Sequence, residues 1–430
     1  MSWSTIIYIF YMAKTFTPFL SFMVPYLIDS CKFTNKEVYN KLNPFFFISS
    51  LIVSLLSFWI IETFGNKISL FIDTALEILV YIIFFVRPEK SYLMGIIVCS
   101  LHGASTAMNS VLKNIIISTA PDKDVSRRVM TNTQTLKNIV SIFSSWIGQD
   151  VYIYSREHRV NIFYSLLALC VSLSVVLLLP SGTNLKKDDA MLTFSSSFRD
   201  IKNYMGEAYD RNTVSYSLIY ICSSILSICL SFFAASIFME RKKKADGNIL
   251  RLNNISISLM KPFRWVSFYL VRLYSFLGGA TNIPKDADND IVIHGYVDGL
   301  AKMVSALLSF GITKINFTEE YLPIVSMSLN MGTMMSLYLL SVVDSLAFSY
   351  LFFIISFSLS SASKVLVVLL LYKNERKSFI ISFNMFVSSF IHIFLSYLSL
   401  YLNSGVQTRF LLYFTVSVLL VSASIVIYNK

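Results

Sequence analysis

Charged residues are scarce in this chain. Only 14% of its 430 residues are Asp, Glu, Lys or Arg, whereas soluble domains carry about 25%. Hydrophobic residues make up 55% of the chain and the mean hydropathy is +0.63, against roughly 45–50% apolar residues in soluble proteins. This composition excludes a soluble globular domain and predicts an all-α polytopic membrane protein.

Cysteine is also rare, and the five cysteines form no CxxC pair. A zinc site or a disulfide framework is therefore not expected, and we predict neither a metal nor a cofactor. The chain also lacks a basic segment before its first apolar run, which begins at Trp3. We therefore expect no cleavable signal peptide, and the first helix should act as the targeting signal.

The net charge of +11 does not indicate a nucleic-acid partner. The cations are spread over many short loops instead of being gathered in one soluble module, and a membrane protein accounts for that distribution. The predicted partners are the lipid bilayer and a small-molecule substrate.

Twelve apolar spans follow one another, each close to the roughly 20 residues that a helix needs to cross a bilayer. A polar connection separates the sixth span from the seventh. This layout predicts an N-terminal six-helix bundle (1–180), a cytoplasmic linker (181–213) and a C-terminal six-helix bundle (214–430). The spans are 3–28, 43–61, 68–86, 93–120, 129–153, 160–179, 214–239, 291–313, 321–341, 345–372, 378–402 and 406–428.

A hydrophilic insertion, residues 240–290, follows the seventh span and contains an amphipathic run near 263–277 that is predicted to lie at the membrane interface. The short loops on the side of the termini hold more Lys and Arg, so both termini are expected in the cytoplasm, with the protein in the plasma membrane. On this orientation the sequon at Asn254 faces outward and that at Asn316 inward.

Two lysines stand within apolar runs of the stretch 92–154, which forms two helices joined by a charged loop. Lys113 lies in the first helix and Lys137 in the second. A lysine at bilayer depth costs about 3 kcal/mol on insertion scales, so it normally faces a wet cavity, a counter-ion or a ligand. Lys364 occupies a similar place in the tenth span, which favours a transporter built from two related halves with its site between them.

A series of motifs along the chain resembles a known family. The matching residues are Phe16, Pro18, Phe22, Pro25, Tyr26, Leu27, Thr34, Asn43, Pro44, Gly103, Thr106, Ala107, Gly148, Gln149, Gly295, Asp298 and Asn384, with the segment Gln407–Tyr413. Their order resembles the reduced-folate carrier and thiamine transporter family of the major facilitator superfamily. The resemblance implies a major-facilitator fold with twelve transmembrane helices in two six-helix halves, and transport of a vitamin-like organic solute by alternating access.

The chain departs from that family where the substrate is concerned. The family's first-helix acid falls on Leu20, its fourth-helix glutamate on Asn109 and a folate-carrier arginine near Ile354, while His392 replaces a lysine or a glutamine. A folate-type anion is the first prediction for the substrate, and thiamine or a thiamine phosphate is the alternative.

Three lysines are candidates for binding an anionic substrate. Lys14, Lys113 and Lys364 belong to spans one, four and ten, which line the central cavity in the major-facilitator fold. Together they would favour a carboxylate or phosphate. The alternative is that each pairs with an acid such as Asp73 or Glu77, or extends to the interface.

Two pairs of charged residues are candidates for gating or coupling. Asp298 and Lys302 are four residues apart on one helix face, so they form either a structural pair or a gate. Asp73 and Glu77 share a face as well, and two adjacent carboxylates in lipid hold a proton unless a cation neutralises them. A counter-transported anion and a proton both remain open as coupling partners.

His392, Asn109 and Tyr26 complete the predicted substrate-binding set. His392 titrates near neutral pH, although a buried histidine also serves to join helices. Asn109 is suited to an interhelical hydrogen bond, and Tyr26 either stacks on a substrate ring or packs in the core.

Two other classes of function stay open. An acidic run, Asp286, Asp288 and Asp290, resembles the metal-binding runs of lumenal glycosyltransferases, but no partner cluster accompanies it, so we predict no enzyme and no catalytic residue. A receptor that has lost transport is the other alternative.

Overall fold

The computed structural model describes residues 3–34, 37–86, 90–119, 123–155, 157–179, 206, 208–242, 261–276, 294–314, 321–371, 377–402 and 405–429. Within these ranges the regular secondary structure is helical. The elements are α1 (Trp3–Thr15), η1 (Leu20–Phe22), α2 (Met23–Asp29), η2 (Val38–Leu42), α4 (Asn43–Val86), α5 (Tyr92–Thr119), α6 (Lys123–Ser155), α7 (His158–Leu178), α9 (Arg211–Lys242), α11 (Lys261–Phe276), α12 (His294–Lys314), α13 (Tyr321–Val342), α14 (Leu346–Leu371), α15 (Lys377–Tyr401) and α16 (Val406–Asn429).

Gly65 divides α4 into two rods. Its φ of 76° and ψ of 168° interrupt the helix, and a backbone conformation of this kind is open to glycine but strained for other residues. A Cβ at this position would meet nothing within 4 Å, so the requirement for glycine is conformational and not steric. With α4 counted as two rods and α1, η1 and α2 as one, the described helices supply the twelve predicted rods, together with the additional helix α11.

Eight described segments are long and apolar enough to cross a membrane, which makes this chain a multi-pass membrane protein. They are Ser4–Ile28, Phe64–Val86, His158–Leu178, Arg211–Ser231, Tyr321–Val342, Leu346–Val368, Ile380–Ser399 and Gln407–Tyr428. Neither α6 nor α12 is among them, because both are less apolar. These two helices pack on each other, so their polar groups find partners in protein instead of lipid.

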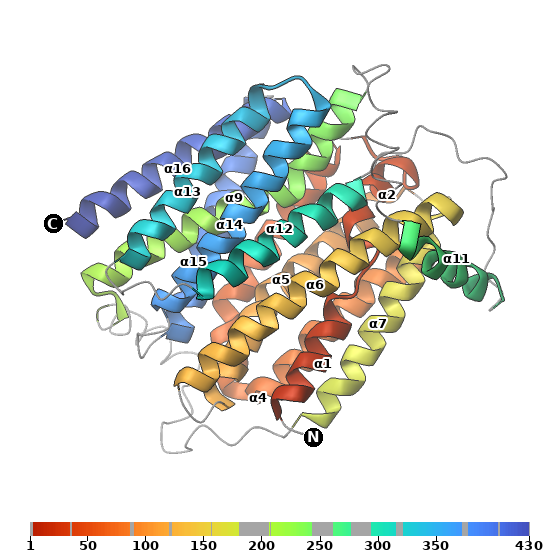
Figure 1. Ribbon diagram of the computed structural model, residues 1–430, viewed down its shortest axis with the longest axis horizontal. Coiled ribbons are helices and arrows are strands. Elements are labelled where there is room, and N and C mark those ends of the chain that lie inside the picture. Colours follow the sequence, from red (N-terminus) through yellow and green to blue (C-terminus); the bar gives the residue numbers. More distant parts are fainter. Residues whose placement is uncertain are drawn as a thin grey trace.

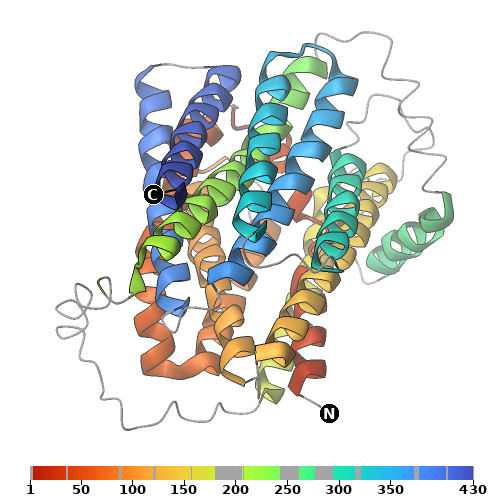
Figure 2. The ribbon, with the colours of Figure 1, turned by 60° about the vertical axis from the view of Figure 1, so that its left-hand side comes forward.

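The helices form two groups that lie side by side (Figures 1 and 2). In the first half α1 packs on α6 and α7, and α4 packs on α5 and α7. In the second half α9 packs on α14 and α16, and α14 also contacts α12 and α13. The contacts between the halves run mainly from α6 to α12 and from α4 to α15.

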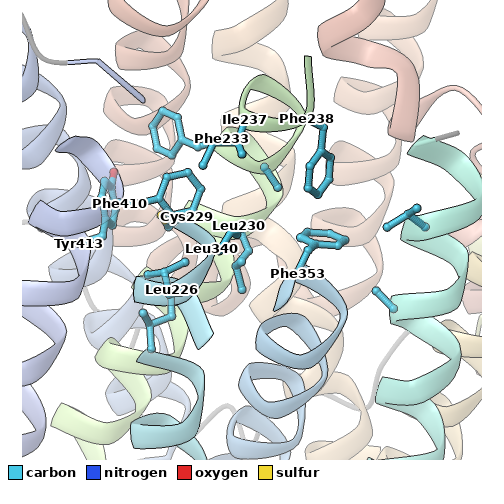
Figure 3. Packing of buried hydrophobic residues seen from close by; sticks show 14 of the residues in the cluster. Leu226, Cys229, Leu230, Phe233, Ile237, Phe238, Leu340, Phe353, Phe410 and Tyr413 are labelled. Carbon is cyan, nitrogen blue, oxygen red and sulfur yellow. The ribbon is translucent and has the colours of Figure 1, made fainter. Parts of the chain in front are cut away.

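The second half is held together by a large apolar cluster centred on α9. Figure 3 shows Cys229, Leu230 and Phe233 meeting side chains of the neighbouring helices. Arg241, near the end of the same helix, is only 3% exposed. Its guanidinium donates to the Leu340 carbonyl at 2.7 Å, which satisfies an acceptor near the end of α13.

Two local predictions need correction. The charged residues from Lys123 to Arg128 were expected in a loop before a helix starting at 129, but they form the first turns of α6. Arg241 was placed in the hydrophilic insertion, but it belongs to α9 and is buried. For Arg241, tertiary packing extends the helix beyond its apolar stretch, because the Ser349 hydroxyl and the Leu340 carbonyl accept hydrogen bonds from the buried guanidinium.

Candidate functional site

The halves meet at the end of the bundle distant from the two termini, in a polar cluster that we call the α6–α12 junction (Ser21, Ser145, Asp298 and Lys302). Asp298 Oδ2 accepts hydrogen bonds from the hydroxyls of Ser21 at 2.7 Å and Ser145 at 2.8 Å. It also accepts one from Lys302 Nζ at 2.6 Å, and Lys302 donates to Ser145 Oγ at 2.8 Å. The predicted Asp298–Lys302 pair therefore exists, and it also joins the two halves.

Two glycines allow α12 to approach α6 closely at this junction. A Cβ on Gly295 would lie 2.7 Å from the Ser145 carbonyl oxygen and 2.8 Å from Gln149 Cβ, and one on Gly299 would overlap the indole of Trp146. The Gly295 amide donates to Gln149 Oε1 at 2.8 Å. Small residues four apart are a recurrent device for close helix packing in membranes.

Farther along the same two helices, Asp150 forms another connection. Its carboxylate, 1% exposed, accepts hydrogen bonds from the hydroxyl of Tyr296 on α12 and from that of Ser267 on α11. This buried acid of α6 thus binds two helices from the second half of the sequence, α11 and α12.

A second contact between the halves joins η2 and α4 to α15 and α16. The imidazole of His392 stacks on Phe47, with ring centroids 5.0 Å apart and planes 10° from parallel. His392 Nδ1 shares a hydrogen bond of 3.0 Å with the Tyr413 hydroxyl. Its Nε2 is buried without a hydrogen-bond partner among the described residues. Ser50 and Ser389 also share a hydrogen bond across this contact, at 3.3 Å.

A third cluster of charged residues lies within the first half. Lys14 on α1 forms an ion pair with Asp73 on α4, and its Nζ is 3.9 Å from Glu77 Oε2. Ser105 on α5 donates to Asp73 Oδ1 at 2.7 Å. The side chains of Lys14 and Asp73 are 10% and 1% exposed. The alternative considered for Lys14, pairing with an intramembrane acid, is therefore the arrangement observed.

The remaining candidates do not join these clusters. Tyr26 is buried within the first half, where its hydroxyl donates to the Phe84 carbonyl at 2.9 Å and its ring packs against Phe19 and Phe84. Lys364 is half-buried on α14, within electrostatic reach of His392.

Some predicted features fall beyond the described residues. The side chains of Asn109 and Lys113 do so although their backbone belongs to α5. The sequons, at Asn254 and Asn316, and the acidic run 286–290 also lie there. Within the described ranges, no group of three or more His, Cys, Asp or Glu side chains is arranged to hold a metal ion.

Sequence reasoning did not identify several residues of the junctions, among them Ser21, Ser145, Tyr296 and Phe47. Serines and aromatics are common throughout this chain, so their types alone carry no signal. The pair Gly295 and Gly299, four residues apart, was the one pattern that could have indicated a close helix contact.

Comparison with known proteins identifies the fold. No protein-family profile and no curated protein sequence matches the chain. The crystal structure of the nucleoside transporter NupG is similar, with a TM-score of 0.59 and 11% identity over 100% of both chains. A mutant of that transporter gives 0.61 and 11% over 99% of this chain and 100% of the other.

An auto-inhibited peptide transporter of the POT family is similar too, with a TM-score of 0.59 and 12% identity, over 100% of this chain and 97% of that one. At such identities the likeness shows the fold alone. The chain therefore has the predicted all-α major-facilitator fold. Its described helices form the twelve predicted rods in two groups, and eight described segments are long and apolar enough to span a membrane.

Proposed function

We propose that this protein is a membrane transporter that moves a small organic solute by alternating access between its two halves. The halves would be residues 1–180 and 214–430, joined by the linker 181–213. The observation that carries the proposal is the major-facilitator fold along the whole chain, combined with polar contacts between the halves at the end distant from the termini. Contacts of this kind can break and re-form as the halves rock.

The α6–α12 junction has the properties of a gate. Asp298 carries its counter-ion, Lys302, on its own helix, so separating α6 from α12 leaves the ion pair intact. What breaks is the set of hydrogen bonds from Ser21 and Ser145. In membranes such bonds contribute about 0.6 kcal/mol each on average, and at most about 1.7. The Asp298–Lys302 pair therefore stays neutralised when the gate opens, although separating the helices also breaks the hydrogen bond from Tyr296 to the buried Asp150.

For the solute, we propose a vitamin-like compound, with a folate-type anion ahead of thiamine or a thiamine phosphate. Lys14 is neutralised by Asp73, so the candidate for binding an anion is Lys364, which is half-buried on α14. His392 Nε2 adds a buried polar atom at the contact between the halves. Lys113 remains a predicted contributor.

For coupling, we propose the cluster of Lys14, Asp73 and Glu77. One lysine contacts two buried carboxylates. The charge of Lys137 also reaches Glu77, so Glu77 can bind a proton when these cations move away from it. Proton coupling is favoured over a counter-transported anion on this ground. We further propose that both termini face the cytoplasm and that the protein resides in the plasma membrane.

Uptake of labelled folate and labelled thiamine by proteoliposomes tests this proposal. For a folate-type anion, Lys364→Gln should raise KM about tenfold or more, because a hydrogen bond to a charged group contributes about 1.5–3 kcal/mol. The matched control is Lys41→Gln, which removes an exposed cation on η2 and should leave KM unchanged.

Equal effects of the two substitutions would contradict a substrate role for Lys364. If the wild-type protein accumulates neither compound, the vitamin-like substrate is wrong. If, in addition, the end of the bundle distant from the termini never opens, transport itself is contradicted. A receptor would then be the better description.

A further inference from the structure

Helix α11 has an unusual position for its place in the chain. It follows α9 and precedes α12, both of the second half, yet it packs against α6 and α7 of the first half. In Figure 1 it runs across those two helices instead of along them, near the end of the bundle where the halves meet. With 16 residues, α11 is also shorter than the roughly 20 residues that a helix needs to cross a bilayer.

The inner face of α11 is firmly docked. Val271 and Tyr274 are 2% and 6% exposed within an apolar cluster that includes Val151. The Tyr164 hydroxyl on α7 donates to the Leu270 carbonyl at 2.6 Å, and Ser267 donates to Asp150. The position of α11 is therefore fixed by packing and hydrogen bonds with the first half.

The outer face of α11 is apolar and basic at the same time. Tyr269 is 63% exposed and Leu273 is 49% exposed. Arg272, also exposed, holds its guanidinium 4.6 Å from the centre of the Phe268 ring. Over its length the helix contains Lys261, Arg264 and Arg272 and no acidic residue. Aromatic side chains beside cations are typical of helices that lie in the headgroup region.

Helix α7, on which α11 is docked, is long and apolar enough to span a membrane. The exposed apolar side chains of α7 include Leu167, Val171, Leu177 and Leu178. A positively charged helix without acids is complementary to anionic headgroups. On the orientation proposed above, these headgroups belong to the leaflet opposite the cytoplasm.

We propose that α11 lies in the membrane–water interface and that its outer face, Tyr269, Arg272 and Leu273, binds the headgroups of anionic phospholipids. The apolar side chains reach the acyl boundary and the guanidinium pairs with the lipid phosphate. This inference does not depend on transport, because it concerns a contact with lipid that exists whether or not a solute moves.

The depth of α11 can be measured in vesicles of phosphatidylcholine and phosphatidylglycerol at 3:1. A Cys170→Ser background removes the one exposed cysteine of the described chain, and an NBD fluorophore is attached to Tyr269→Cys or Leu273→Cys. Brominated lipids should quench both labels, at a shallower depth than a label on Leu167→Cys.

The preference for anionic lipid is tested by adding increasing amounts of phosphatidylglycerol to the protein in mixed micelles and measuring the rise in Tm. The concentration dependence of that rise gives an apparent affinity. Arg272→Gln should weaken the apparent affinity about fivefold, which corresponds to about 1 kcal/mol for one cation near an anionic surface. Lys41→Gln, the loss of an exposed cation elsewhere, should not.

Two results would overturn the proposal. The first is water-like NBD emission from the labels at positions 269 and 273, without quenching by brominated lipid. This result would overturn the proposal whether the outer face is then free or covered by a second copy of the chain. The second is an Arg272→Gln protein that keeps the full effect of phosphatidylglycerol, or a Lys41→Gln protein that loses as much of it.

Discussion

The close approach of α12 to α6 gives a sharp test of the gate. At Gly295 an added Cβ would lie 2.7 Å from the Ser145 carbonyl oxygen and 2.8 Å from Gln149 Cβ. The first is a backbone atom of α6 and the second is a Cβ fixed to that backbone, so neither can move away by side-chain rotation. In Gly295→Ala the two helices must therefore separate by several tenths of an ångström, and the hydrogen bonds of the α6–α12 junction lengthen with them.

The size of the effect follows from the cost of overpacking, which is about 1–3 kcal/mol. That strain exists only while this end of the bundle is closed. Gly295→Ala should therefore shift the equilibrium toward the open far end by about 5- to 150-fold. The matched control is Gly311→Ala in the same helix, where an added Cβ meets nothing within 4 Å and helix propensity improves by up to about 1 kcal/mol.

The assay is the distance between spin labels at Lys41→Cys and Tyr401→Cys, in a Cys170→Ser background. Lys41 lies on η2 of the first half and Tyr401 at the end of α15 in the second half, both at the far end. Gly295→Ala should enlarge the population with long distances, and Gly311→Ala should match the wild type. An unchanged distance distribution in Gly295→Ala would refute the view that contact between α6 and α12 keeps this end closed.

Two further predictions concern stability, measured by thermal unfolding in detergent. Lys14→Met should destabilise the fold by about 3–5 kcal/mol, because it leaves the carboxylate of Asp73 buried without its cation. Adding Asp73→Asn should restore much of the lost stability. A double variant no more stable than Lys14→Met would contradict this pairing. Glu37 lies in the loop before α4, where the Thr34 amide, the Tyr92 hydroxyl and Lys90 lower its pKa from the ordinary 4.5 to about 2. A depressed carboxyl pKa stabilises the fold above the unfolded-state value and the gain is lost as pH falls through the folded-state value. The Tm advantage of wild type over Glu37→Gln should therefore be full near pH 6 and disappear between about pH 4.5 and pH 2, and an advantage that does not change with pH would contradict it.

The fold could be predicted from the sequence to a large extent. Long apolar runs identify most of the helices because each run must be shielded from water, and the polar segment before residue 214 indicates the division into halves. Helix ends were less predictable. Helix α6 already begins at Lys123. The turn at Arg241 is helical because neighbouring helices cover its side chain and bind it, and no local pattern reports a neighbour from another part of the chain.

The candidate site divides in the same way. Asp298 and Lys302 were predicted to interact because helical geometry places residues four apart on one face, and the structure shows that bond. The partners Ser21 and Ser145 come from segments 277 and 153 residues away from Asp298. Their choice depends on which helices pack together.

By itself, the sequence determined that the chain crosses a membrane many times in two groups of helices, because hydrophobic burial follows directly from residue type and spacing. The tertiary structure alone decided which charges neutralise one another. It paired Lys14 with Asp73 across 59 residues, and it brought α11 from the second half onto the first. Ion pairs and hydrogen bonds act over a few ångströms, so their partners are set only when the helices have packed.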